Sequence, residues 1–136
     1  MRLSERSCAG SLSRRQAVAL LAALGVSADA IAQDASKANP RSYRVVLENN
    51  SVRVIEYKSR PGLGVCGEGM HSHPAHLTVV LSDWKGRATD ADGSVVARDK
   101  KLGDVFWSEA ETHKVENTGR TNSRVLIIEL KEAHKA

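Results

Sequence analysis

The sequence predicts a single all-β domain whose short antiparallel strands form a sandwich or a closed barrel. From Tyr43 onward, apolar residues recur in short runs bounded by turn residues, which is the pattern of strands. No stretch shows apolar residues at helical spacing over three turns. The chain has 136 residues, 41% of them hydrophobic and 26% charged, so it is long enough for one globular core and too short for two. Closing the sheet would remove the exposed strand edges that invite aggregation.

Residues 1–32 are expected to be an export signal. A basic stretch precedes the apolar run Ala17–Val26, and Ala30-Ile31-Ala32 fits the small-x-small pattern of a cleavage site. Ser13-Arg14-Arg15 resembles a twin-arginine signal, although Ala17 and Val18 stand where Phe and Leu are usual. A general secretory signal, or a basic amphipathic helix that stays attached, is the alternative. The apolar run is about half the ~20 residues that a bilayer requires, so we expect a soluble mature protein, periplasmic or secreted, without a membrane partner.

The net charge does not indicate a nucleic-acid partner. The formal charge is +4, and half of this excess lies in the first thirty residues, within the expected signal. The remaining charges of both signs are interspersed, without the clustered Lys and Arg that DNA or RNA binding rewards.

After a polar linker at residues 33–42, we expect the barrel domain at residues 43–131 and a charged tail at residues 132–136. Leu77–Leu81 is a continuous apolar run suited to a buried strand, and Asp92-Gly93 is a strong hairpin signal. Further turns are expected at Lys101–Asp104 and Asn117–Gly119. In order, the expected strands are Tyr43–Leu47, Val52–Lys58, Leu77–Leu81, Gly86–Thr89, Ser94–Arg98, Val105–Trp107, Thr112–Glu116 and Arg124–Leu130.

Histidines provide the strongest functional signal. Three of the five lie in His71-Ser72-His73-Pro74-Ala75-His76. Side chains two apart on a strand face the same side, so His71 and His73 can point together into the barrel, and Pro74 favours an extended backbone at His73. His113 lies on a later strand. Imidazole is a common ligand for Zn, Cu, Fe and Ni, so the pattern predicts a site for one divalent metal ion.

These residues resemble the two motifs of the cupins. The first is His71-x-His73 followed by an apolar strand, and the second is Gly103-Asp104, then His113 and Asn117. The resemblance covers Val52 to Leu130, and it implies an antiparallel jelly-roll β-barrel around one divalent metal ion, which could be Fe, Mn, Zn, Ni or Cu. In the second motif, Glu109 and Glu111 stand where Pro and Gly are usual.

The first motif departs from the cupin pattern. Cupins generally have a glutamate three or four residues after the second histidine, where this chain has Leu77 and Thr78. Aligning the following apolar strand instead brings His76 to the third ligand position, as in cupins that use four histidines. A histidine at the rim of the site is the alternative role for His76. The resemblance thus implies a metal set of His71, His73, His76 and His113.

Three glutamates lie close to these motifs in sequence. Glu68, Glu109 and Glu111 are candidates to approach the metal, to accept hydrogen bonds from the imidazoles or to act as a general base. Solvated loop residues are the alternative for each. Phe106 and Trp107 are expected in the core or in a pocket wall.

Cupin folds serve many functions, so the resemblance does not select one. Four neutral imidazoles would leave the charge of the metal uncompensated, which favours a small anionic or oxygen-rich ligand. We therefore expect an exported metal-dependent oxidoreductase, dioxygenase-like, that acts on such a molecule. A cupin that binds a metal or small ligand without turnover, or a cupin isomerase or lyase, is the alternative. A homodimer is compatible with the sequence.

The export signal can be tested directly. Changing Arg14 and Arg15 together to Lys should leave the precursor in the cytoplasm if the twin-arginine route is used, because that route recognises the arginine pair. Cell fractionation and immunoblotting measure the outcome. Mature-sized protein in the periplasm would instead indicate the general secretory route.

Overall fold

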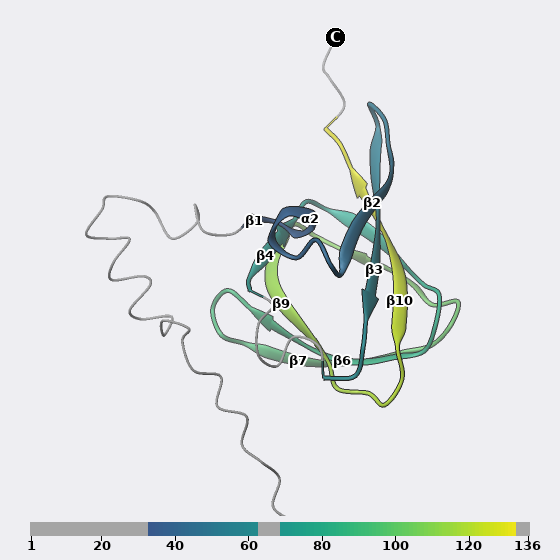
Figure 1. Ribbon diagram of the computed structural model, residues 1–136. Helices are drawn as coiled ribbons and strands as arrows, with labels where there is room; N and C mark the ends of the chain where they lie inside the picture. The colour runs from purple at the N-terminus through teal and green to yellow at the C-terminus, as the bar shows by residue number, and fades with distance from the viewer. Residues whose placement is uncertain (1–32, 63–68, 133–136) are drawn as a thin grey trace, which may run out of the picture. The chain divides into compact units, whose positions relative to one another are not determined.

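The computed structural model describes residues 33–62 and 69–132 (Figure 1). The expected export signal, Glu68 and the end of the charged tail lie outside these residues. In chain order the elements are β1 (Gln33–Asp34), α2 (Ala35–Ala38), β2 (Tyr43–Glu48), β3 (Val52–Ser59), β4 (His71–His73), β5 (His76–Val80), β6 (Trp84–Asp90), β7 (Val95–Lys100), β8 (Val105–Ser108), β9 (Glu111–Asn117) and β10 (Ser123–Leu130).

The strands form two five-stranded sheets. One has the order β1-β4-β9-β6-β7 and the other β2-β3-β10-β5-β8. All pairs are antiparallel except the short parallel pair of β1 with β4. From β3 onward the chain passes repeatedly between the two sheets, which surround a common interior (Figure 1). This arrangement confirms the predicted antiparallel jelly roll.

Each strand expected from the apolar runs is present, with ends that differ by one or two residues. The expected Asp-Gly hairpin joins β6 to β7, and Gly93 adopts a positive φ of 93°. Glycine tolerates this backbone conformation because it has no Cβ. The same holds at the turn before β8, where Gly103 has a φ of 90°. Asn117 also closes its turn as expected, because its Oδ1 accepts a hydrogen bond from the Gly119 amide at 2.9 Å.

Residues 33–42 differ from the expected linker. They contain β1 and the single turn α2, whose Ala35 is completely buried in the core. The carboxylate of Asp34 caps this turn by accepting a hydrogen bond from the Ser36 amide at 3.0 Å. The sequence did not predict these elements because the segment is mostly polar, and because a one-turn helix is too short to show apolar periodicity.

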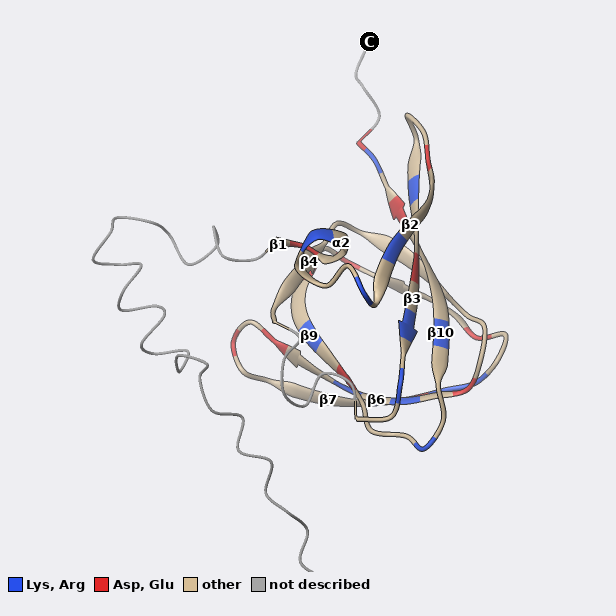
Figure 2. Ribbon diagram, viewed as in Figure 1, with Lys and Arg blue, Asp and Glu red and all other residues tan. Residues whose placement is uncertain are grey.

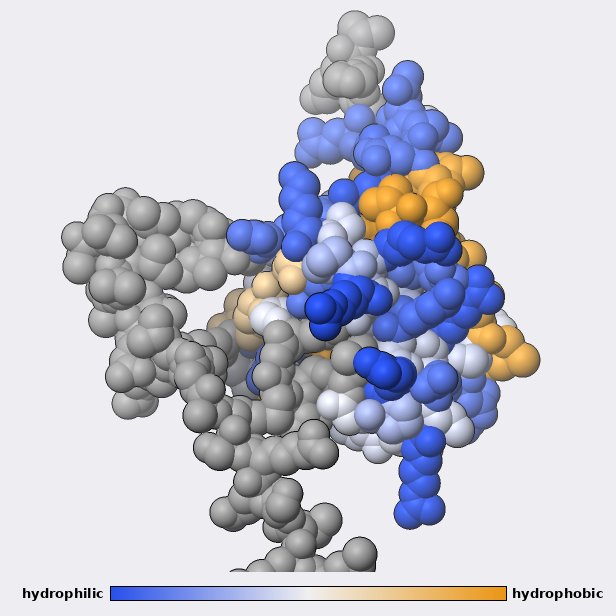
Figure 3. Space-filling view, in the orientation of Figure 1, coloured by the Kyte–Doolittle hydropathy of each residue, from blue (hydrophilic) through white to orange (hydrophobic). Residues whose placement is uncertain are grey.

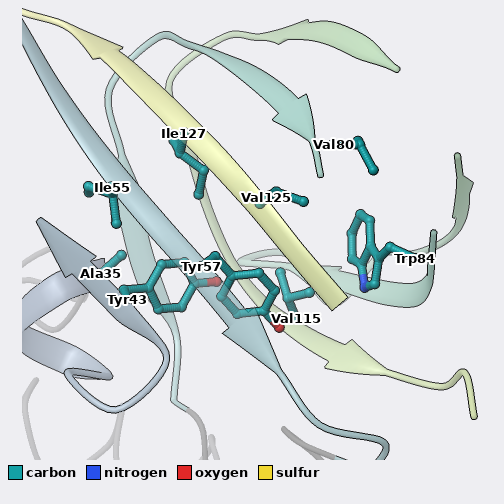
Figure 4. Close-up of a cluster of buried hydrophobic side chains, with 9 residues drawn as sticks. All are labelled: Ala35, Tyr43, Ile55, Tyr57, Val80, Trp84, Val115, Val125 and Ile127. Atoms are coloured by element: carbon teal, nitrogen blue, oxygen red, sulfur yellow. The ribbon is translucent and has the colours of Figure 1, made fainter. Parts of the chain in front are cut away.

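The core lies between the sheets (Figure 4). Tyr43 and Tyr57 pack ring to ring, with centroids 4.6 Å apart, at one end of the buried cluster, and Trp84 lies at the other (Figure 4). The aliphatic members of the cluster come from α2 and from strands of both sheets: Ala35, Ile55, Val80, Val115, Val125 and Ile127.

The described surface carries charges of both signs on most strands, as Figure 2 shows. Apolar side chains are exposed on the edge strand β2, where Val45, Val46 and Leu47 are 37–50% accessible next to a β-bulge. Figure 3 shows a hydrophobic patch in this region. No helix in the described ranges is both long and apolar enough to cross a bilayer.

Gly86 permits the packing of Trp84. A Cβ built at Gly86 would lie 2.5–2.7 Å from three atoms of the Trp84 indole. Gly86→Ala should therefore displace the indole and destabilise the fold by roughly 1–3 kcal/mol, as overpacking usually does.

Thermal melts and tryptophan fluorescence measure this effect, with Gly69→Ala as the matched control because a Cβ there meets nothing within 4 Å. Equal melting temperatures for Gly86→Ala and Gly69→Ala would show that the indole does not rest on Gly86.

Candidate metal centre

The register of β4 with β9 assembles the candidate centre. His71 and His73 point to one face of β4 because they are two residues apart. Antiparallel pairing places His113 opposite His71 and Glu111 opposite His73. Directly opposite side chains on an antiparallel pair lie on the same face. Three imidazoles and a carboxylate therefore form two adjacent cross-strand pairs facing the interior.

The three histidines are close enough to share one ion. Each offers a ring nitrogen, and these atoms all lie within 4.8 Å of one another. The ring centroids are 4.9–5.5 Å apart. All three side chains are buried. The structure thus brings together three of the four histidines that the sequence predicted, His71, His73 and His113.

One nitrogen of each imidazole makes no hydrogen bond within the part of the chain that the structure describes. Nε2 of His71, Nε2 of His73 and Nδ1 of His113 are buried without a hydrogen bond to any described residue. Unpaired buried polar atoms are costly and rare, so three of them in one cluster call for an explanation. A bound metal ion would satisfy such nitrogens, because neutral imidazole coordinates through its free lone pair.

A buried carboxylate orients His73. Nδ1 of His73 lies 2.8 Å from Oε1 of Glu129, which comes from β10. The ionised carboxylate can only accept, so Nδ1 carries the proton and Nε2 keeps its lone pair. Glu129 is held by Arg53, whose Nε donates to Oε2 at 2.7 Å. Arg53 also pairs with Asp34.

His71 is oriented from the other side. Its Nδ1 lies 3.3 Å from the carbonyl oxygen of Gly69 and 3.2 Å from the side-chain nitrogen of Asn39, which follows α2. The Gly69 carbonyl would accept a hydrogen bond from Nδ1 and the Asn39 amide nitrogen would donate one to it, so the two contacts position the ring without fixing its tautomer. Burial, together with the neighbouring charges of His73 and His113, lowers the pKa of His71 to about 3. His71 is therefore neutral at physiological pH, as a metal ligand must be.

His76 lies beside the three-histidine group without joining it. Its ring centroid is 5.0 Å from that of His73, but its Nδ1 bonds the Pro74 carbonyl at 2.8 Å. Its Nε2 lies 3.4 Å from Oε1 of Glu111. Burial lowers the pKa of His76. The ligand role of His76 stays a prediction.

Of the three glutamates that the sequence identified as candidates, Glu111 is the one that lies beside the histidines. Its Oε2 lies 3.3 Å from Nδ1 of His113 and 3.8 Å from Nη2 of Arg98. Burial would raise its pKa, but the contact with His113 and the charges of His113, Arg98 and His76 outweigh this effect and lower the pKa to about 2. With Asp90 and His113 it forms a second group whose candidate ligand atoms lie within 4.8 Å.

Of the other candidates, Glu109 and Trp107 lie away from the histidines. Glu109 is exposed and accepts a hydrogen bond from the indole nitrogen of Trp107 at 2.8 Å. Trp107 is itself 48% exposed, which differs from the expected core or pocket-wall position, whereas Phe106 lines the cavity. Glu68 lies outside the described residues.

A cavity opens next to the histidines. It measures about 430 Å³, including the part that is open to solvent. His73, His76, Glu111 and His113 line it together with aromatic and aliphatic side chains from both sheets. A largely apolar lining with a few polar side chains is typical of sites for small molecules.

Sequence reasoning did not identify Glu129 or Asn39. A signal existed for Glu129, because it is a charged residue at an inward-facing position of the most hydrophobic strand, Arg124–Leu130. No comparable signal existed for Asn39, which reaches His71 only because α2 folds against β4.

Comparisons with known proteins address the fold. No protein-family model matches the chain, and no curated protein matches it. Among solved structures, a cupin domain from Bordetella pertussis Tohama I is similar, with 25% identity and a TM-score of 0.57 over 65% of this chain and 91% of that chain. A predicted oxalate decarboxylase from Thermotoga maritima has 26% identity and a TM-score of 0.45 over 65% and 79%. KdgF from Halomonas sp. has 16% identity and a TM-score of 0.46 over 68% and 79%.

The Bordetella pertussis domain has the same arrangement of strands over most of its length, and the expected pair of motifs lies in the segments that carry the histidine cluster. The chain therefore has the cupin fold, with a histidine cluster in its interior that could hold a metal ion.

Proposed function

We propose that this chain is a cupin that holds one divalent transition-metal ion on His71, His73 and His113. The single observation that carries the proposal is the group of three buried imidazoles, each with a ring nitrogen that makes no hydrogen bond within the described residues. At His73, the hydrogen bond to Glu129 leaves that nitrogen with the lone pair. Imidazole ligands suit Zn, Cu, Fe and Ni, and a site with added carboxylate also suits Mn.

Glu111 and His76 would complete the surroundings of the ion. Glu111 comes from β9 rather than from the first motif, but it lies in the cavity beside His113 and supplies a carboxylate in place of the missing cupin glutamate. His76 directs Nε2 toward Glu111 at 3.4 Å. Because Nδ1 of His76 donates to the Pro74 carbonyl, Nε2 of His76 carries a lone pair and is an acceptor. Nε2 and the Glu111 carboxylate are therefore both acceptors, and a cation between them would relieve their repulsion.

We further propose that the protein is a dioxygenase-like oxidoreductase that acts on a small anionic or oxygen-rich molecule. A bound redox-active metal would supply Lewis acidity and electron transfer. The chain contributes the rest. Glu129 orients His73, Gly69 and Asn39 hold His71 in place, and Phe106 and Trp84 give the cavity an aromatic lining from both sheets.

The low pKa of Glu111 favours a second candidate function, in which the cupin binds a ligand without turnover. A general base works best with a pKa near the working pH, so a carboxylate with a pKa of about 2 is a weak one. The metal found in protein purified without an affinity tag indicates which chemistry is open to the site. Iron, manganese or copper favours oxygen chemistry, while zinc favours hydrolysis, isomerisation or a structural role.

Export to the periplasm or the exterior also stays a proposal, supported by the sequence of residues 1–32. A twin-arginine route would suit a protein that folds and takes up its metal before crossing the membrane. A homodimer is likewise a proposal, and the exposed apolar residues of β2 are compatible with one.

The metal set predicts the behaviour of single histidine variants. His73→Ala and His113→Ala should each lose nearly all bound metal, because two imidazoles hold a divalent ion weakly. His76→Ala should lower the affinity sharply if His76 is a ligand and should keep full stoichiometry if it lies at the rim. Elemental analysis per chain, with thermal melts in the presence and absence of chelator, measures these outcomes.

His134→Ala is the control, since it removes a histidine from the charged tail. The metal site proposed here is wrong if His73→Ala and His113→Ala both keep one equivalent of metal.

The hydrogen bond between Glu129 and His73 leads to a second prediction for the same site. Glu129→Gln should weaken metal binding about tenfold to a hundredfold, because the neutral amide no longer raises the basicity of His73 or fixes its tautomer. Glu116→Gln is the matched control, since Glu116 is also buried and also bonds an arginine, Arg87, at 2.6 Å, but does not contact the histidines. Metal titration of both variants measures the difference, and equal affinities would exclude an orienting role for Glu129.

A further inference from the structure

The β6–β7 hairpin gathers nitrogen donors on the cavity side of the barrel. Gly86 on β6 lies opposite Arg98 on β7. Trp84, two residues before Gly86, shares its face, and its indole covers Gly86 closely enough to occupy the space of a Cβ. Since cross-strand neighbours share a face, the indole also lies beside the side chain of Arg98.

Two donors of this pair make no hydrogen bond within residues 33–62 and 69–132. Trp84 and Arg98 both line the cavity that the histidines border. Nε1 of Trp84 and Nε of Arg98 are buried and make no hydrogen bond to any described residue. Both groups can only donate. Buried polar atoms normally find a partner, so the missing partner here is an acceptor.

The charge of Arg98 is only partly balanced. Its nearest carboxylate oxygen, on Glu111, is 3.8 Å from Nη2, beyond hydrogen-bonding distance. On the other side, Cζ of Arg98 lies 5.9 Å and Nζ of Lys100 lies 4.5 Å from the centre of the Phe106 ring. Two cations thus flank one wall of the cavity. With a divalent ion on neutral histidines, the interior would carry excess positive charge.

We infer that Arg98 and Trp84 form a subsite for the carboxylate of a small organic acid, whose remaining oxygens face the histidines. The guanidinium presents Nε and a terminal nitrogen side by side, a fork that matches the two oxygens of a planar carboxylate. The indole N–H adds a third donor. The inference rests on the proposed function for the role of the histidines, and it specifies the substrate class as a small carboxylic acid that reaches both Arg98 and the histidines across the cavity that they line.

Acetate is the probe and acetamide its neutral counterpart. The chain has two tryptophans, so two-dimensional ¹H–¹⁵N spectra show two indole signals, which Trp107→Phe assigns. In the full chain, acetate should shift the Trp84 signal and leave that of Trp107 unchanged, and acetamide should shift neither. Titrations with zinc added and after chelation separate binding at the subsite from binding at the metal.

Arg98→Gln should weaken acetate binding roughly tenfold to a hundredfold, since it removes charged hydrogen bonds. Arg98→Lys should restore part of the affinity, because it keeps the charge but not the fork. Arg87→Gln is the control, since Arg87 lies on the same hairpin and pairs with Glu116. Trp84→Phe, compared with Trp107→Phe by calorimetry, tests the indole N–H without removing the ring.

The outcomes distinguish the two proposals. An unshifted Trp84 signal, or equal acetate affinity in the original chain and Arg98→Gln, would overturn the carboxylate subsite even if metal content is complete. Binding that is lost in Arg98→Gln but seen in a protein that takes up no metal would support the subsite and overturn the metal role. Inorganic phosphate that binds more tightly than acetate at Arg98 would overturn the assignment to carboxylates.

Discussion

The pairing of β4 with β9 is the constraint on which the interior site depends. It places His71 against His113 and His73 against Glu111, so that all four side chains face inward. If one of these strands slipped by one residue, its two inward-facing side chains would turn to the opposite face of the sheet, because the side-chain period of a strand is two. The outward residues reinforce the register, since Ser72 and Thr112 share a hydrogen bond of 2.8 Å on the other face.

Charges buried around the histidines are arranged in pairs rather than singly. Glu129 is 2% exposed, and an isolated carboxylate at that depth would be strongly destabilising. Arg53 and His73 bind its two oxygens, and Asp34 binds Arg53 in turn. This chain of contacts connects β1, β3, β4 and β10, so the orientation of one imidazole depends on both sheets. A buried network of this kind favours one arrangement of its members because any partial arrangement leaves a charge unpaired.

The sequence pattern predicted the strands well because each strand has alternating or continuous apolar residues and is bounded by clear turn residues, such as Asp92-Gly93. It also identified His71 and His73, since a spacing of two on a strand is visible in one dimension, and it identified His113 through the resemblance to the second cupin motif. It could not choose between Glu109 and Glu111, because that choice depends on cross-strand register, which directs Glu111 inward and leaves Glu109 at the surface. Glu129 and Asn39 were missed for a related reason, since each reaches a histidine only through tertiary packing.

The site is built from segments that are far apart in the chain. His73 and Glu129 are 56 residues apart, and Glu129 and Arg53 are 76 apart. Contacts at such separations form only after large loops have closed, so they appear late in folding and slow it. The unfolded chain keeps His71 and His73 near each other but lacks His113 and the groups that fix the tautomers. Metal uptake at the proposed site would therefore follow folding, and the metal supply of the compartment where the strands pair would decide which ion the protein carries.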